Sequence, residues 1–186
     1  MLRLPHFKPA RSSKGFTIVE LLIVVVVIGI LAVIAVSAYT KSQDDARTNR
    51  IANDLAQLKK AIMAARVARG DVALRVITGS TYSAGNCANK ANGTDLAALD
   101  RTTDNCWTAY ANALSAISNA AGTNVRDLED PWGRPYFIDE NETEGVSVPC
   151  GNGKDRIGVY GRPHVNGSGG ITNAVLVPYI TIGCGP

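Results

Sequence analysis

Histidine is scarce in this chain, and several common enzymatic and metal-binding motifs are missing from it. Its 186 residues include only two histidines, His6 and His164. No two of its four cysteines are spaced as Cys-x-x-Cys, and no Gly-rich phosphate loop of Walker spacing is present. A Ser/His/Asp catalytic set cannot be assembled convincingly around so few histidines. We therefore expect neither an enzyme nor a zinc site.

Acidic residues are absent from the first 15 positions. The four charges of this leader are all positive, and removing it after Gly15 lowers the formal side-chain charge of the chain from +3 to −1. The remaining balance does not favour a nucleic-acid surface. By the positive-inside rule, the leader holds the N-terminus in the cytoplasm, so everything after Tyr39 lies outside. The basic residues of the leader are Arg3, Lys8, Arg11 and Lys14.

Polar residues are also absent from residues 21–36, where nothing is more polar than Gly29. Residues 16–38 form a stretch of 23, and roughly 20 apolar residues suffice to cross a membrane as a helix. A secretory signal peptide is cut after its apolar run and loses it. Here a Gly-Phe junction precedes the run, so a cut after Gly15 keeps the helix in the mature protein.

Glu20 is the one charged residue of this apolar stretch. An ionised carboxylate is costly there unless it has a partner, and its neighbours in sequence supply none. A cut after Gly15 would create the α-amine of Phe16. If identical helices pack in parallel with an axial offset, that amine can pair with Glu20 of the next chain. This arrangement predicts a homo-oligomer built by ordered polymerisation.

Residues 15–24, Gly-Phe-Thr-Ile-Val-Glu-Leu-Leu-Ile-Val, resemble the leader junction and N-terminal helix of the type IV pilin superfamily. This superfamily includes type IV pili and the pseudopili of type II secretion. The resemblance implies cleavage after Gly15 by a prepilin peptidase, N-methylation of Phe16 and an assembly role for Glu20. It also implies storage in the cytoplasmic membrane, contact with the pilus assembly machinery, and a filament that is periplasmic or extracellular.

A second resemblance lies at residues 130–136, Asp-Pro-Trp-Gly-Arg-Pro-Tyr. It is similar to a turn found in the globular domain of major pseudopilins and some related pilins. Asp-Pro opens a turn, Gly133 can take a positive φ, and Pro135 leads into an apolar strand. Trp132 is expected to fold over the edge of the sheet. This turn favours the secretion branch.

Residues 41–69 are predicted to continue the helix with one apolar stripe. Gly70 is a plausible stop, and no proline interrupts residues 16–69. The stripe of this first helix consists of Ile51, Leu55, Leu58, Ile62 and Ala65, with charged residues including Lys59, Lys60 and Arg66 at the remaining positions.

A second helix is expected within residues 104–121, since Trp107, Tyr110, Leu114 and Ile117 fall at helical spacing.

The rest of the chain is predicted to form a small antiparallel sheet against the long helix, which makes the fold class α+β. Residues 72–77 are expected to form a short strand or to extend the helix, and residues 79–93 an irregular surface loop. Further strands are predicted at 145–148, 156–160 and 171–182. The domain division is a leader (1–15), a transmembrane and assembly helix (16–39), its amphipathic continuation (40–70) and a globular domain (71–186).

Four cysteines lie beyond the apolar stretch, which predicts disulfides on the exported side. Four cysteines allow three connectivities, of which we favour Cys87 with Cys106 and Cys150 with Cys184. In the family that the sequence resembles, a disulfide enclosing the C-terminal region is typical of pilins, whereas major pseudopilins more often bind calcium there. The cysteines therefore favour a pilus.

Calcium is a weak alternative at Asp139, Asn141, Glu144 and Asp155. Glu144 stands where an EF-hand loop needs glycine, so a solvated acidic turn that includes Glu140 is the expected structure and no cofactor is predicted. The leading functional prediction is a filament subunit of the pilus type, and the alternative is a secretion pseudopilin. An alternative from another class is a membrane-anchored extracytoplasmic domain that never polymerises.

Overall fold

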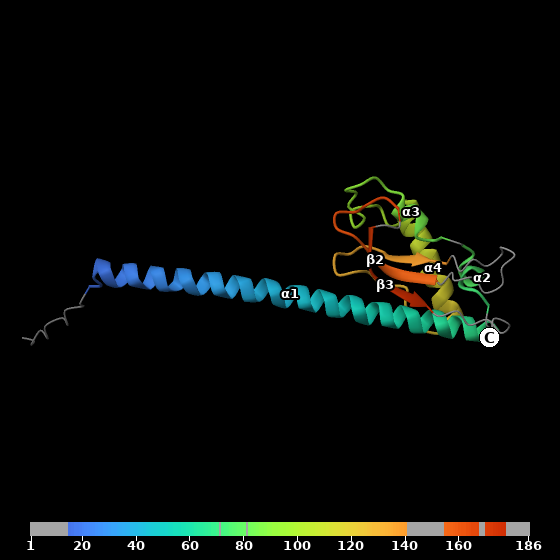
Figure 1. Cartoon of the computed structure of the whole chain (residues 1–186), viewed down its shortest axis with the longest axis horizontal. Coiled ribbons are helices and arrows are strands. Elements are labelled where there is room, and N and C mark those ends of the chain that lie inside the picture. Colours follow the sequence, from blue (N-terminus) through green and yellow to red (C-terminus); the bar gives the residue numbers. More distant parts are fainter. Residues whose placement is uncertain (1–14, 71, 81, 141–154, 168–169, 178–186) are drawn as a thin grey trace, which may run out of the picture. The chain divides into compact units, whose positions relative to one another are not determined.

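The computed structural model describes residues 15–70, 72–80, 82–140, 155–167 and 170–177. The chain divides into two compact units, Met1–Asp45 and Ala46–Pro186, each of which is described by itself. Figure 1 shows the elements in chain order. They are α1 (Ile18–Ala68), α2 (Leu74–Thr78), α3 (Gly85–Ala88), α4 (Asn105–Ala121), β1 (Tyr136–Asp139), β2 (Asp155–Tyr160) and β3 (Ile171–Val177).

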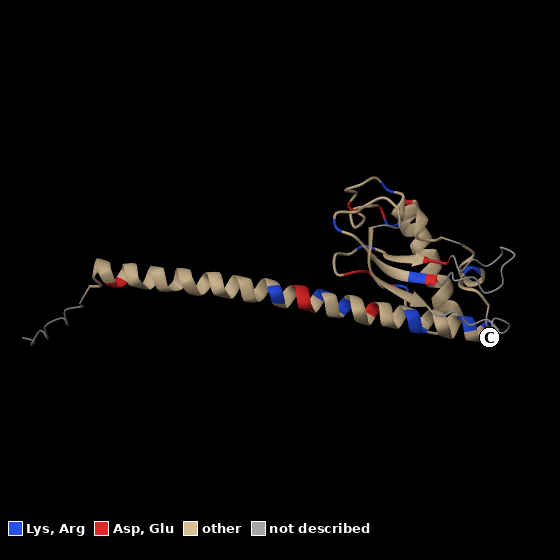
Figure 2. Cartoon of the chain, in the orientation of Figure 1, with Lys and Arg blue, Asp and Glu red and all other residues tan. Residues whose placement is uncertain are grey.

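The first unit contains the apolar part of α1. Its side chains are exposed all round, as expected of a helix without an amphipathic stripe. Glu20 is the only charged residue between Ile18 and Thr40, and charges of both signs return from Lys41 onward (Figure 2). By length and composition, α1 can cross a membrane, and none of its most apolar stretch is buried.

The second half of α1 belongs to the second unit and carries the predicted stripe. All five stripe residues, from Ile51 to Ala65, are buried, which confirms the prediction made from their spacing. The prediction for Arg66 is wrong, however. It was assigned to the polar positions beside the stripe, but its side chain is buried because a carboxylate lies within reach from the sheet.

Helix α4 begins and ends where the sequence predicted. Asp104 is its N-cap and accepts a hydrogen bond from the Cys106 backbone N–H at 2.8 Å. Gly122 ends the helix with a φ of 66°, a left-handed conformation that glycine adopts without steric cost. The four residues at helical spacing are all buried: Trp107, Tyr110, Leu114 and Ile117.

The segment between α1 and α4 differs from the prediction in two places. Leu74–Thr78 is a separate short helix, neither a strand nor a continuation of α1, because Gly70 has already ended α1 with a φ of 84°. The expected surface loop at 79–93 contains α3, and its Cys87 and Ala88 are buried. These residues pack in a small cluster with Phe137 and Tyr160, a contact that sequence composition cannot reveal.

The three strands form an antiparallel sheet in the order β1-β2-β3. Tyr136 pairs with Val159, and Tyr160 pairs with Ile171. At the irregularity in β2, a Cβ on Gly158 would lie 2.8 Å from the Ile171 side chain, so the close approach of β3 requires glycine. The predicted strand at 145–148 and the end of the predicted strand at 171–182 lie outside the described residues.

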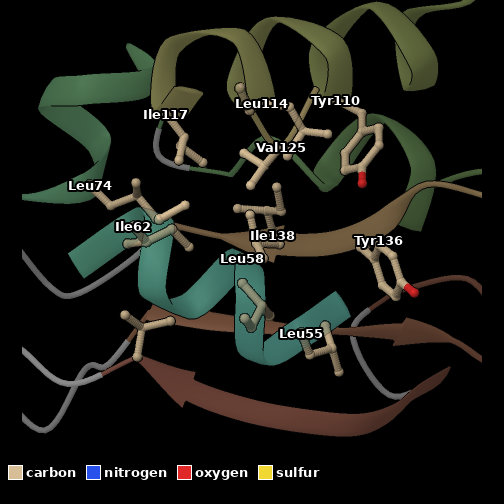
Figure 3. Packing of buried hydrophobic residues seen from close by; sticks show 14 of the residues in the cluster. Leu55, Leu58, Ile62, Leu74, Tyr110, Leu114, Ile117, Val125, Tyr136 and Ile138 are labelled. Atoms are coloured by element: carbon tan, nitrogen blue, oxygen red, sulfur yellow. The ribbon is translucent and has the colours of Figure 1, made fainter. Parts of the chain in front are cut away.

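The hydrophobic core joins the second half of α1, α4 and the sheet, which confirms the α+β class. Burying one large aliphatic side chain of this kind contributes roughly 1.5–3 kcal/mol. The sheet therefore depends on both helices to cover its apolar residues. Figure 3 shows Leu58 and Ile62 of α1 with Leu114 and Ile117 of α4 gathered around Ile138 of β1.

Candidate functional site

The Gly15-Phe16 junction lies just before the first turn of α1. Neither residue is part of the helix, and nothing lies within 4 Å of the position that a Cβ on Gly15 would take. The Phe16 side chain is 84% exposed. In the first unit, the peptide bond predicted to be cut is therefore in an exposed, non-helical segment, as a peptidase substrate requires.

Glu20 has a partner within its own chain, which corrects the expectation that its neighbours supply none. Its Oε2 accepts hydrogen bonds from the backbone N–H of Thr17 at 2.9 Å and from the Thr17 hydroxyl at 2.8 Å. The Glu20 backbone N–H in turn donates to Thr17 Oγ1 at 3.2 Å. This reciprocal pattern is a capping box, and it satisfies N–H groups that the first turn of a helix leaves unpaired. Thr17 gives the Glu20 carboxylate two hydrogen-bond donors, but it supplies no positive charge to neutralise it.

The predicted disulfide between Cys87 and Cys106 is present in the structure. It joins α3 to the first turn of α4, both of which belong to the second unit. The other predicted pair, Cys150 and Cys184, lies outside the described residues. Once Cys87 is paired with Cys106, these two cysteines can form a disulfide within the chain only with each other.

Two of the calcium candidates carry ion pairs with arginine. Asp139 on β1 accepts from Arg156 at 2.7 Å, and Asp155 on β2 is paired with the buried Arg66. Asn141 and Glu144 lie outside the described residues. Among the residues that the structure does describe, no group of three His, Cys, Asp or Glu side chains could hold a metal ion.

The predicted turn at residues 130–134 is held by side chains as well as by its backbone. The Asp130 carboxylate accepts from the backbone N–H groups of Trp132 and Arg134, and Gly133 has a φ of 74°, as the sequence suggested. Arg134 is buried and donates through Nε to Asp130 at 2.7 Å. Its other nitrogens donate to the carbonyls of Tyr160 and Gly161, so the turn is fastened to the end of β2.

Glu140 is a buried acid whose environment was not anticipated from the sequence. It follows β1 directly, and its two oxygens accept from the backbone N–H and the hydroxyl of Ser83. Burial raises the pKa of Glu140 to about 7, although the Ser83 hydrogen bonds act in the opposite direction. The sequence placed Glu140 in a solvated acidic turn, and nothing local indicated a partner 57 positions away.

Comparisons with known proteins agree with the geometry at the start of α1. The family described as the prokaryotic N-terminal methylation motif matches residues 10–36. Fimbrial protein Q of Moraxella bovis is 31% identical over 138 residues, which are 65% of this chain and 84% of that protein. No solved structure matches the chain.

Two further relatives match over shorter stretches. The type IV major alpha-pilin of Moraxella bovis is 46% identical over 54 residues, 29% of this chain and 34% of that protein. Fimbrial protein EcpB of Eikenella corrodens is 45% identical over 51 residues, 27% of this chain and 32% of that protein. The matched stretches cover about a third of the length of these two relatives.

Proposed function

Because the chain belongs to the type IV pilin superfamily, we propose that it is the structural subunit of a type IV pilus-like filament. In this proposal a prepilin peptidase cuts between Gly15 and Phe16, the new amine is methylated, and the subunit waits in the cytoplasmic membrane with its N-terminus in the cytoplasm. The pilus assembly machinery then packs the helices of residues 16–38 into a periplasmic or extracellular polymer.

The observation that carries this proposal is that the two carboxylate oxygens of Glu20 differ in their hydrogen-bond partners. Oε2 accepts both hydrogen bonds from Thr17, whereas Oε1 has no hydrogen-bond partner among the described residues. The capping box therefore stabilises the carboxylate and leaves one oxygen for a second chain. The Phe16 amine of a neighbouring subunit can supply the positive charge that Thr17 cannot.

The first test replaces Glu20 with alanine in a strain or reconstituted system that assembles the protein. Membrane insertion and cleavage should persist, since neither depends on the carboxylate, whereas filaments should be lost. Asp127→Ala is a matched control, because Asp127 is an exposed acid of the globular domain. Normal filaments from the Glu20→Ala protein would overturn the proposed role. The mass of the mature N-terminus provides an independent readout, since a methylated Phe16 supports the filament and an intact leader supports the non-polymerising anchor.

A pseudopilin of type II secretion is the second candidate, and the turn fastened by Arg134 is the observation that favours it. The predicted disulfide between Cys150 and Cys184 and the similarity to Fimbrial protein Q favour the pilus. Long surface filaments would support the pilus, and short periplasmic ones the pseudopilus. Calcium chelation adds a second criterion: a lower melting temperature after chelation would support the pseudopilin, and an unchanged one the pilus.

A further inference from the structure

A pocket of about 570 Å³ opens on the globular unit, away from the residues used for polymerisation. Three loops line it, at residues 93–97, 132–134 and 162–164. Its volume falls in the range of roughly 300–1,000 Å³ that is usual for small-molecule sites. None of its residues takes part in the proposed assembly, so the pocket needs its own explanation.

Hydrogen bonds between two of these loops preform the pocket. The Gly93 backbone N–H donates to the carbonyl of His164 at 2.8 Å, and the Asn166 N–H donates to Asn92 Oδ1 at 2.6 Å. The Lys90 carbonyl, 3.2 Å from His164 Nε2, can only accept, so this nitrogen carries the proton. The third loop, at residues 132–134, is held by the hydrogen bonds from Arg134 to the carbonyls of Tyr160 and Gly161. The wall is therefore fixed before any ligand arrives.

Arg162 provides an available cation at the edge of this pocket. Its side chain is exposed, and its guanidinium carbon lies 4.6 Å from the centre of the Trp132 ring. It makes no hydrogen bond or ion pair within the described part of the chain, whereas Arg134 is buried and fully engaged. An exposed guanidinium without a hydrogen-bond acceptor in the protein has N–H groups available for bidentate contact with a carboxylate.

The same wall also carries groups suited to hydroxyls. Asp95 is exposed, and its Oδ1 accepts from the Ala97 backbone N–H, which leaves Oδ2 without a partner in the described chain. The Thr94 hydroxyl donates to Ala91 O and can still accept. Two buried atoms of the wall, Trp132 Nε1 and His164 Nδ1, have no hydrogen-bond partner among the described residues. Both atoms are closed to solvent, so the contacts with hydroxyls are assigned to Asp95 and Thr94.

We propose that this pocket binds a carboxylated sugar unit, with Arg162 holding the carboxylate and Asp95 accepting from ring hydroxyls. A simple inorganic anion fits poorly, because the Asp95 carboxylate would repel it. A neutral sugar would leave the Arg162 guanidinium without an acceptor. A sugar acid matches the Arg162 cation and the Asp95 carboxylate together.

The test titrates full-length mature protein in detergent micelles with galacturonic acid and N-acetylneuraminic acid, followed by saturation-transfer NMR. At least one acid should bind, and galactose should bind about tenfold more weakly or worse, since a charged hydrogen bond contributes roughly 1.5–3 kcal/mol. A titration with the methyl glycoside of the acid that binds then shows whether the pocket recognises a free sugar or the end of a glycan chain. Equal binding of the glycoside points to the end of a glycan chain, and loss of binding points to the free sugar.

Two variants and one matched control decide which residues hold the ligand. Arg162→Gln should weaken binding about tenfold without unfolding the domain, because the side chain is exposed and has no hydrogen bonds to lose. Arg69→Gln is the control, since Arg69 is also an exposed arginine of the globular unit and lies outside the pocket. Asp95→Asn should weaken binding of the sugar acid.

Three results would overturn the proposal. The first is that neither sugar acid binds. The second is an equal loss of affinity in Arg162→Gln and Arg69→Gln. The third is that acetate competes as well as the sugar acid and binds more tightly to Asp95→Asn, which identifies a simple anion site. Each readout uses the single chain, so none depends on whether the protein polymerises.

Discussion

Arg66, in the last turn of α1, and Asp155, the first residue of β2, form an ion pair whose two side chains are almost completely inaccessible, at 1% and 0% exposed. The two residues lie 89 positions apart in the sequence. Their contact fastens the end of the long helix to the sheet. Removing one member of such a pair leaves an uncompensated buried charge, which costs more than the pair itself contributes.

Arg66→Met should therefore lower the free energy of unfolding of the globular unit by about 3–5 kcal/mol. The double variant Arg66→Met/Asp155→Leu should recover most of this loss, because no charge remains buried. Arg156→Met is the control, since Arg156 is 44% exposed in its pair with Asp139 and should cost less than about 1 kcal/mol. Denaturant titration of the full-length protein measures all three. Equal losses in Arg66→Met and Arg156→Met would contradict the prediction.

The buried carboxyl of Glu140 should make stability fall as the pH rises. Its pKa is raised from 4.5 in a model compound to about 7 in the folded protein. Between these values the folded state keeps a proton that the unfolded state releases. Its contribution is therefore fully present below about pH 4.5 and lost by pH 7, a change of about 3 kcal/mol.

Glu140→Gln should remove this pH dependence, because glutamine does not titrate. We expect the difference in unfolding free energy between wild type and variant to change by about 3 kcal/mol from pH 4.5 to pH 7.5. Parallel curves for wild type and Glu140→Gln would show that Glu140 is not the group responsible.

The Thr17 hydroxyl should stabilise the first turn of α1. Thr17→Val removes both hydrogen bonds of the hydroxyl and keeps the backbone N–H that donates to Glu20. Loss of such a cap costs about 1 kcal/mol, which corresponds to roughly fivefold faster hydrogen exchange at the Glu20 amide. Exchange measured by NMR in micelles tests this, with Thr17→Ser as the variant that keeps the cap. Unchanged exchange in Thr17→Val would argue against the capping box.

The Cys87–Cys106 disulfide encloses 18 intervening residues and should contribute about 3 kcal/mol to stability. Replacing both cysteines with alanine should lower the free energy of unfolding by that amount, as thermal or denaturant unfolding would report. Mass spectrometry of a non-reducing digest tests the second predicted pair at the same time. It should yield a linked peptide containing Cys150 and Cys184, and free thiols at these positions would refute that pair.

The features predicted correctly are those whose causes lie close together in the chain. The buried stripe of α1 depends on spacings of three and four residues, and the ends of α4 depend on Asp104 and Gly122. The turn at residues 130–134 depends on an aspartate and a glycine three positions apart. In the cap and the turn, the deciding residues bond to their own neighbours, and in the stripe the spacing alone decides which side chains share one face of the helix.

The features missed depend on distant partners. Arg66 looked like one of several polar residues of α1, and Glu140 like one of several acids in a turn, until Asp155 and Ser83 were brought beside them. The capping box at Glu20 differs from these two, because its Thr-x-x-Glu signal is local; an expectation based on charge alone does not include the hydroxyl and amide of Thr17.

The sequence by itself therefore determined the Gly15-Phe16 motif, the apolar helix with its single carboxylate and the membership in the superfamily, since all three are properties of consecutive residues. Only the tertiary structure decided which charges are buried, which cysteine pairs with Cys87, and which loops meet around Arg162. The physical reason is that burial and electrostatic pairing depend on distances in space, and folding brings together residues that lie tens of positions apart.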